Sequence, residues 1–147
     1  MKPVFKSDGT VTAGNASGLN DAAAALVMAT DQGLKNGRMR PMARVVSYGL
    51  AGVDPRLMGL GPVPASRLAL QRAGLRTDAL DVVESNEAFA AQACAVTRAL
   101  ELDPRKVNPN GSGISLGHPV GATGAILVTK AVYELHRIQG RYALVTM

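Results

Sequence analysis

Apolar and polar residues follow two different spacings along this chain, and the two spacings alternate. Helical spacing or an unbroken apolar run marks residues 22–28, 65–73, 87–100 and a segment that follows residue 124. Short segments with the composition or alternation typical of strands lie at residues 10–13, 43–50, 80–84, 106–108 and 142–147. Strands that alternate with helices predict an α/β fold.

Two of the expected helices carry an apolar stripe along one face. In the first helix the stripe consists of Phe89, Ala93, Val96 and Leu100. In the second it consists of Leu127, Ala131, Leu135 and Ile138. Residues 22–28, unbroken by Gly or Pro, predict a buried helix that Asn20 or Asp21 caps. Residues 31–41 contain two glycines and three basic residues and are expected to form a linker.

The composition is compatible with one domain that has its own core. Hydrophobic residues make up 47% of the 147 residues, aromatic residues only 3%, and Trp is absent. Ala, Val, Leu and Gly must therefore fill the core, which suits close packing of helices on a sheet. The charged fraction of 18% argues against a disordered chain.

The net charge of +5 limits the possible partners. Such a charge is compatible with nucleic acid, an acidic membrane surface or a polyanionic small ligand. The Lys and Arg residues are scattered and few aromatic residues could stack on bases, so we expect no nucleic-acid partner. The longest apolar run, residues 22–29, is too short to span a bilayer, so we expect no membrane partner.

The cysteine count bears on redox setting and metal binding. One cysteine excludes an intramolecular disulfide framework. With only two histidines, at unrelated positions, it also predicts that the chain has no metal site. The first residues lack the apolar core of a signal peptide, so we expect a cytoplasmic location.

A Gly-rich segment with one histidine is the clearest candidate for chemistry. Residues 111–124 contain five glycines around His118 and lead into a helix. An imidazole in such a loop could be structural, or it could act as a general base beside backbone N–H groups that bind an oxyanion. Leu116 interrupts a dinucleotide fingerprint and no Gly-Lys-Ser/Thr is present, so phosphate binding of either type is disfavoured.

Asn86 and Cys94 each allow two interpretations. Asn86 stands between a predicted strand and a predicted helix, where Asn is a good N-cap, although its side chain could also face a cleft. Cys94 invites pairing with His118 as a nucleophile. It lies two turns into the helix with no Gly turn to expose it, so we expect a small buried hydrophobic residue instead. Glu134 is expected on the exposed side of the last helix.

Three motifs give the chain a family resemblance. Gly-His-Pro-x-Gly-Ala-x-Gly around His118, Asn86-Glu87-Ala88-Phe89 and residues 15–21 together resemble the thiolase family. The resemblance implies a reversible acyltransferase reaction that joins two acyl-CoA molecules into 3-ketoacyl-CoA and free CoA. It makes His118 the base for a nucleophilic cysteine and an oxyanion donor. It also makes Asn86 the holder of a water in the oxyanion hole, with Glu87 in support.

The same resemblance implies residues that bind acyl-CoA. Ser17, with Ala13 and Gly14, would contact the pantetheine arm, although Ser17 could equally belong to a tight turn. Met58 would line the acyl pocket, although a Met there could simply fill a gap in the core. Phe89 and Gly117 complete the expected substrate-binding residues. CoA thioesters would be substrates, so no cofactor is expected.

The resemblance also implies a domain organisation. Residues 1–40 correspond to the end of a thiolase N-terminal half and residues 41–147 to a C-terminal domain without its final strand. The expected fold is thus a thiolase-like layered α/β fold, incomplete, whose complete form is a homo-oligomer. The sequence of residues 107–119 is similar to that of broad-specificity biosynthetic β-ketothiolases of the polyhydroxyalkanoate pathway.

Both cysteines of the family lie outside the 147 residues, so we expect the isolated chain to be inactive. Two alternatives stay open. One is a non-catalytic module that binds acyl-CoA or lipid. The other is a chain that works only with a separate N-terminal half.

Overall fold

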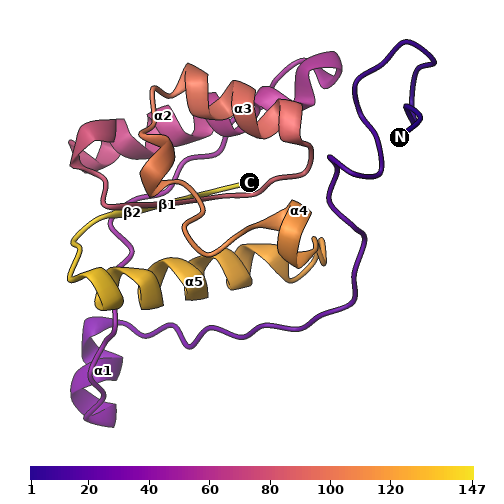
Figure 1. Cartoon of the computed structure of the whole chain (residues 1–147). Coiled ribbons are helices and arrows are strands. Elements are labelled where there is room, and N and C mark those ends of the chain that lie inside the picture. Colours follow the sequence, from indigo (N-terminus) through magenta and orange to yellow (C-terminus); the bar gives the residue numbers. More distant parts are fainter.

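The computed structural model, which describes residues 1–147, contains a parallel two-stranded sheet with helices on both faces (Figure 1). Strand β1 (Val82–Ser85) pairs with β2 (Ala143–Thr146), and Val82 lies opposite Ala143. Parallel neighbours cannot be joined by a tight turn, and the connection here contains helices. The predicted α/β class is therefore confirmed.

Three helices cover this sheet. Helices α2 (Pro62–Ala73) and α3 (Ala90–Ala99) lie on one face, and α5 (Thr123–Ile138) lies on the other (Figure 1). The first turn of α2 contains Pro62, where a missing N–H costs no helical hydrogen bond. The helix ends at Gly74, whose φ of 65° lies in the left-handed region that glycine adopts without strain.

Five segments predicted from hydrophobic spacing are confirmed. The helices expected at residues 65–73, at residues 87–100 and after residue 124 are present, and so are the strands expected at residues 80–84 and 142–147. Their boundaries differ from the expected ones by three residues at most. Each of these segments has an apolar face that another element of the chain covers.

Shorter segments connect these elements. They are α1 (Asp31–Gly37), η1 (Pro55–Leu60), η2 (Thr77–Ala79), η3 (Pro104–Lys106) and α4 (Gly113–Leu116), the η segments being 3-10 helices. The strands expected around Thr12 and Val107 are reduced to isolated bridges, with Pro3 and Val83 respectively. None of the helices combines the length and the apolar character needed to cross a bilayer.

The core lies between the sheet and helices α2 and α3. Its buried residues are Val63, Leu70, Leu80, Val83, Val96, Leu100, Leu102 and Leu144. On the opposite face, α5 buries Leu127 and Ala131 of its apolar stripe. Because β1 is covered on both faces, all four of its residues are buried. One of them, Glu84, is charged.

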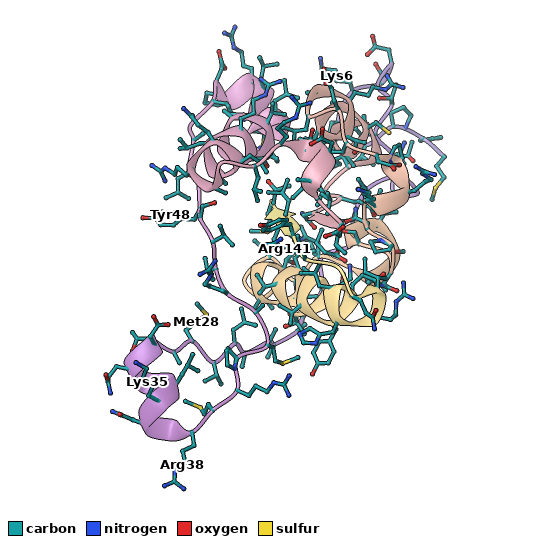
Figure 2. The ribbon with its side chains drawn as sticks, turned by 90° about the vertical axis from the view of Figure 1, so that its left-hand side faces the viewer. Lys6, Met28, Lys35, Arg38, Tyr48 and Arg141 are labelled. Atoms are coloured by element: carbon teal, nitrogen blue, oxygen red, sulfur yellow. The ribbon has the colours of Figure 1, made fainter.

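Residues 22–28 form no helix, so that prediction is wrong. The segment has no regular structure and its side chains are exposed, Val27 at 89%. Seven residues are too few for a stable helix without an apolar surface to pack against. No element of this chain provides that surface. Figure 2 shows Met28 on a part of the chain that projects from the sheet and its helices.

The linker and strand predicted in the same part of the chain are also wrong. Residues 31–37 form helix α1, because the Thr30 hydroxyl caps it by accepting a hydrogen bond from Gly33 N at 3.1 Å. Residues 43–50 form no strand, because no other strand lies beside them to complete a ladder. Figure 2 shows Lys35 on this projecting part.

Candidate active site

His118 and Asn86 meet, although they are 32 residues apart in the sequence. Asn86 Nδ2 lies 3.4 Å from His118 Nε2. Asn86 is buried, with 4% of its surface exposed, and His118 is half-buried. Asn86 Oδ1 is buried and has no hydrogen-bond partner in the protein. An acceptor in that state can take a hydrogen bond from a bound molecule.

Thr123 orients the imidazole of His118. Thr123 Oγ1 lies 2.8 Å from His118 Nδ1 and donates its own proton to the Pro119 carbonyl at 3.0 Å. The hydroxyl must therefore accept the hydrogen bond from Nδ1–H. This assignment leaves His118 Nε2 unprotonated and turned toward Asn86. An unprotonated Nε2 is the form of histidine that can act as a base.

Asn86 stands at the carboxyl end of the sheet. Its backbone N–H donates to the Thr146 carbonyl of β2 at 3.0 Å, which continues the strand pairing by one residue. The N-cap of α3 is Phe89, so Asn86 does not cap that helix. Its side chain is thus free to face His118. In open α/β sheets, ligands bind outside the carboxyl ends of the strands, and Asn86 occupies that position.

Asn108 holds the backbone just before Asn86. Its side chain pairs with both backbone groups of Ser85, accepting from N–H and donating to the carbonyl, each at 2.8 Å. Its amide also donates to Glu87 Oε1 at 3.2 Å. Glu87 Oε2 in turn accepts from the Ile114 backbone N–H at 3.4 Å. Asn108 and Glu87 therefore connect the loop that contains Asn86 to the loop of residues 111–118, which leads to His118.

Residues near the N-terminus bind the backbone of His118. Its N–H donates to the Gly18 carbonyl at 3.0 Å and to Asn20 Oδ1 at 3.2 Å. The preceding Gly117 has a φ of 96°, and a Cβ at that position would lie 2.3 Å from Asn20 Oδ1. Both the backbone conformation and the close approach require glycine here.

The segment around Ser17 bonds to the residues that follow Asn86. The Ser17 backbone N–H donates to the Ala88 carbonyl at 3.0 Å, and Ala16 forms an antiparallel bridge with Phe89. Phe5 packs edge-on against Phe89, with 5.9 Å between the ring centroids. The structure therefore joins the Ser17 segment to the residues that follow Asn86, and Gly117 directly precedes His118.

The three other predicted substrate-binding residues are Ala13, Gly14 and Met58. Ala13 and Gly14 belong to the turn before Asn15, where Gly14 N–H donates to the Thr12 hydroxyl. Met58 lies in η1 with 69% of its surface exposed. No hydrogen bond of the structure connects any of these three residues to Asn86 or His118.

Two side chains are placed differently from the expectation. Cys94 is exposed on α3, so the prediction of a buried residue is wrong. It lies on the side of α3 that no other element covers. Glu134 is buried with 4% of its surface exposed, so its predicted exposure is also wrong. Arg137 and Asn110 enclose its carboxylate through hydrogen bonds of 2.6 to 2.9 Å.

Sequence reasoning missed Thr123, Lys130 and Glu84. Thr123 follows His118 by five residues at the start of α5, and a hydroxyl at that point was a recognisable signal. Glu84 interrupts a buried apolar strand, and Lys130 lies on α5 between the stripe residues Leu127 and Ala131. A charged residue within an apolar pattern signals a buried ion pair, and Lys130 Nζ lies 2.6 Å from Glu84 Oε2.

An open hollow of about 360 Å³ lies next to His118. It is lined by residues 20–24 and by residues 119–122. The chain contains no group of three or more His, Cys, Asp or Glu side chains that could hold a metal ion. The polar side chains in its lining are those of Asn20 and Asp21.

Relatives of known function match almost the whole chain. It is 69% identical over 148 residues to the beta-ketothiolase BktB of Cupriavidus necator, covering 100% of this chain and 38% of that protein. It is 53% identical to the acetyl-CoA acetyltransferase of Shinella zoogloeoides, again covering 100% of this chain and 38% of the relative. The chain thus spans less than two-fifths of the length of these relatives.

Solved structures show the same fold. An acetyl-CoA acetyltransferase from Bacillus anthracis superposes with a TM-score of 0.95 at 49% identity, covering 98% of this chain and 36% of the other. Human mitochondrial 3-ketoacyl-CoA thiolase in complex with CoA superposes with a TM-score of 0.90 at 47% identity, covering 97% and 36%. The thiolase-like, incomplete α/β fold is thereby confirmed.

Family models agree with these comparisons. The thiolase N-terminal domain matches residues 1–32, and the thiolase C-terminal domain matches residues 39–147. The chain belongs to the thiolase family.

Proposed function

We propose that this chain supplies the base and the oxyanion-binding groups of a thiolase-type acyltransferase. The reaction joins two acyl-CoA molecules into 3-ketoacyl-CoA and free CoA, and it is reversible. The observation that carries the proposal is the contact between Asn86 Nδ2 and His118 Nε2, with the Nδ1 side of the ring fixed by Thr123. The names of the relatives, beta-ketothiolase and acetyl-CoA acetyltransferase, support the same reaction class.

His118 has two tasks in this mechanism. Its unprotonated Nε2 first takes the proton of a cysteine thiol, and the resulting thiolate attacks the carbonyl carbon of an acyl-CoA thioester. The thioester oxygen gains negative charge in the tetrahedral intermediate. The protonated Nε2 then donates a hydrogen bond to that oxygen, and as the carbonyl reforms CoA leaves and takes up the proton from Nε2. Thr123 keeps Nδ1–H occupied throughout, so only Nε2 exchanges the proton.

Asn86 stabilises the same oxygen from the other side. Its amide is buried and its backbone is fixed by Thr146 and, through Ser85, by Asn108. A group that is already oriented costs no reorganisation when charge develops. Asn86 Oδ1, which has no partner in the protein, is suited to hold a water that donates to the thioester oxygen.

CoA thioesters enter this proposal as substrates, without a cofactor. Ser17, Phe89 and Gly117 are the proposed contacts for the acyl-CoA chain, and the bonding of the Ser17 segment to Ala88 and Phe89 supports this. Ala13, Gly14 and Met58 are proposed to contribute once the remainder of a complete thiolase surrounds them. The CoA complex of the human mitochondrial relative supports CoA as the ligand. A homo-oligomeric assembly and a cytoplasmic location belong to the same proposal.

A chimeric enzyme tests the function. The chain would replace its matching segment in the beta-ketothiolase of Cupriavidus necator, which supplies the rest of a complete thiolase, and acetoacetyl-CoA thiolysis would be measured. We expect turnover, and we expect His118→Ala to lower kcat by at least about a hundredfold with little change in KM. Asn86→Ala should act in the same direction but more weakly, because a water can occupy part of the vacated space.

His136→Ala is the matched control. His136 contacts the Met42 carbonyl at 2.8 Å and takes no part in the site, so its replacement should leave kcat unchanged within about twofold. If His118→Ala kept most of the wild-type kcat, His118 would be structural and the proposed mechanism would be wrong. Binding of acyl-CoA without turnover in the active-site-intact chimera would instead favour a binding module.

A further inference from the structure

A lysine on α5 binds both loops of the candidate site. Lys130 Nζ donates to Glu84 Oε2 at 2.6 Å and also to the Gly111 carbonyl. Glu84 is on β1, two residues before Asn86. Gly111 begins the loop that continues through α4 to His118. Only 16% of the Lys130 side chain is exposed, so both interactions are largely shielded from water.

Glu84 depends on this lysine. Its side chain has no exposed surface, and its second oxygen, Oε1, is buried without a hydrogen-bond partner in the protein. Burial raises the pKa of the Glu84 carboxyl, and the hydrogen bond and charge of Lys130 oppose that rise. A buried carboxylate is costly unless it is paired, so the ammonium group is the partner that keeps Glu84 in place.

Other contacts between the two loops are neutral or long. Ser112 Oγ donates to the Ser85 carbonyl at 3.0 Å, and the Ile114 N–H reaches Glu87 at 3.4 Å. Lys130 adds a charged group that binds one acceptor on each loop. The same helix carries Thr123, two turns earlier, which orients the His118 ring. Helix α5 therefore controls both the position of the loop and the orientation of the imidazole.

We infer that Lys130 is a positioning residue, which sets the distance between Asn86 and His118 by binding Glu84 and the Gly111 carbonyl together. The inference rests on the proposed function as far as catalysis is concerned. Its structural part, the ordering of residues 111–118 by Lys130, holds independently of any reaction. An error of about 1 Å in the placement of catalytic groups lowers rates on the order of a hundredfold.

The test compares Lys130→Met with Lys106→Met in the chimera. Lys106 is the matched control, because its Nζ also donates to a backbone carbonyl, that of Leu80 at 2.6 Å, at the end of β1 away from the site. We expect Lys130→Met to lower kcat on the order of tenfold to a hundredfold, with KM within about twofold. Lys106→Met should leave kcat and KM within about twofold of wild type. Lys130→Arg, which keeps the positive charge, should have a higher kcat than Lys130→Met.

A double variant separates positioning from simple charge neutralisation. Lys130→Met alone leaves Glu84 buried and unpaired and could prevent folding. Lys130→Met with Glu84→Gln removes both charges, so the fold should recover while the Gly111 carbonyl remains unbound. We expect kcat of the folded double variant to stay at least about tenfold below wild type. Recovery of kcat to within about twofold would overturn the inference, because Lys130 would then serve only to neutralise Glu84.

Amide hydrogen exchange provides a measurement that does not depend on catalysis. Leu116 N–H and Gly117 N–H bond within the loop to the Ser112 and Gly113 carbonyls, at 2.8 and 3.0 Å. In the chimera, their exchange should accelerate at least about tenfold in the double variant and not in Lys106→Met. Unchanged exchange would overturn the inference even if kcat fell. Faster exchange in the double variant would support the ordering role of Lys130 independently of catalysis. If His118→Ala also left the kcat of the chimera unchanged, the proposed function would be refuted while the ordering role stood.

Discussion

Thr123→Val removes the acceptor that orients His118 while keeping the shape of the side chain. The Pro119 carbonyl still has hydrogen-bond donors in this variant, because it also accepts from the backbone N–H groups of Ala122 and Thr123 at 2.8 and 2.9 Å. The loss therefore falls on His118 Nδ1–H, which is left without a partner in a half-buried position. A buried donor that loses its partner costs about 1–3 kcal/mol.

The imidazole can avoid this cost by moving its proton to Nε2. Nε2 would then no longer be able to accept a proton, and it would point a hydrogen toward Asn86 Nδ2, which is itself a donor. A free energy of about 1–3 kcal/mol corresponds to a factor of roughly 5 to 150 in the population of the competent tautomer. We expect kcat of Thr123→Val in the chimera to fall by a factor within that range. Thr123→Ser keeps the hydroxyl and should stay within about twofold of wild type.

Two measurements check the reasoning. Thiolysis of acetoacetyl-CoA gives kcat, and the ¹⁵N chemical shifts of the imidazole nitrogens report which nitrogen carries the proton. The chain has two histidines, so His136 provides an internal reference whose shifts should not move. If Thr123→Val kept kcat within about twofold and His118 kept its proton on Nδ1, the hydroxyl would not select the tautomer and the reasoning would be refuted.

Two further predictions concern side chains outside the site. Hydrogen bonds from Arg137 and Asn110 hold the pKa of Glu134 at about 2, below its ordinary value of 4.5. Its carboxylate therefore stabilises the fold above pH 4.5, and this contribution is lost as the pH falls toward about 2. The difference in melting temperature between wild type and Glu134→Gln should shrink over that window, and a constant difference would contradict the assignment. Cys94 is exposed on α3, so Cys94→Ala should leave the kcat of the chimera within about twofold, and the 147-residue chain alone should show no thiolysis. Turnover of the chain alone that disappears in Cys94→Ala would contradict this.

Hydrophobic spacing predicted those elements whose partners lie within the chain. Val96 and Leu100 of the first stripe and Leu127 and Ala131 of the α5 stripe are buried, so pattern and structure agree there, whereas Ile138 at the end of α5 is exposed. Residues 22–28 and 43–50 also have clear patterns, but residues 22–28 are exposed and residues 43–50, although α2 contacts Ser47 and Tyr48, have no strand beside them. A pattern shows which face needs burial, and it does not show whether a partner surface is available. Residues 31–37, which were expected to be a linker, form helix α1 because Thr30 caps its first turn.

The site was predictable to the extent that its residues form local motifs. The glycines and His118 stand in one segment, and Asn86 in another. Thr123 follows His118 by five residues within the same motif and could have been found from its spacing. The contact of Lys130 with Glu84 joins positions 46 residues apart, and no local rule connects them. The burial of Glu134 and the exposure of Cys94 likewise depend on how α5 and α3 pack.

The backbone hydrogen bonds of His118 to Gly18 and Asn20 have a consequence for the order of folding. Asn20 lies 98 positions before His118, whereas the pairing of β1 with β2 joins Val82 to Ala143, 61 positions apart. Closing a loop of that length costs an entropy that grows as (3/2)RT ln n, about 4 kcal/mol before any constant contribution. Closing the shorter loop between β1 and β2 costs about 0.4 kcal/mol less by the same relation, and it also buries the core, whereas the anchor gains only backbone hydrogen bonds. We therefore expect the imidazole to acquire its final backbone anchor after the sheet has formed.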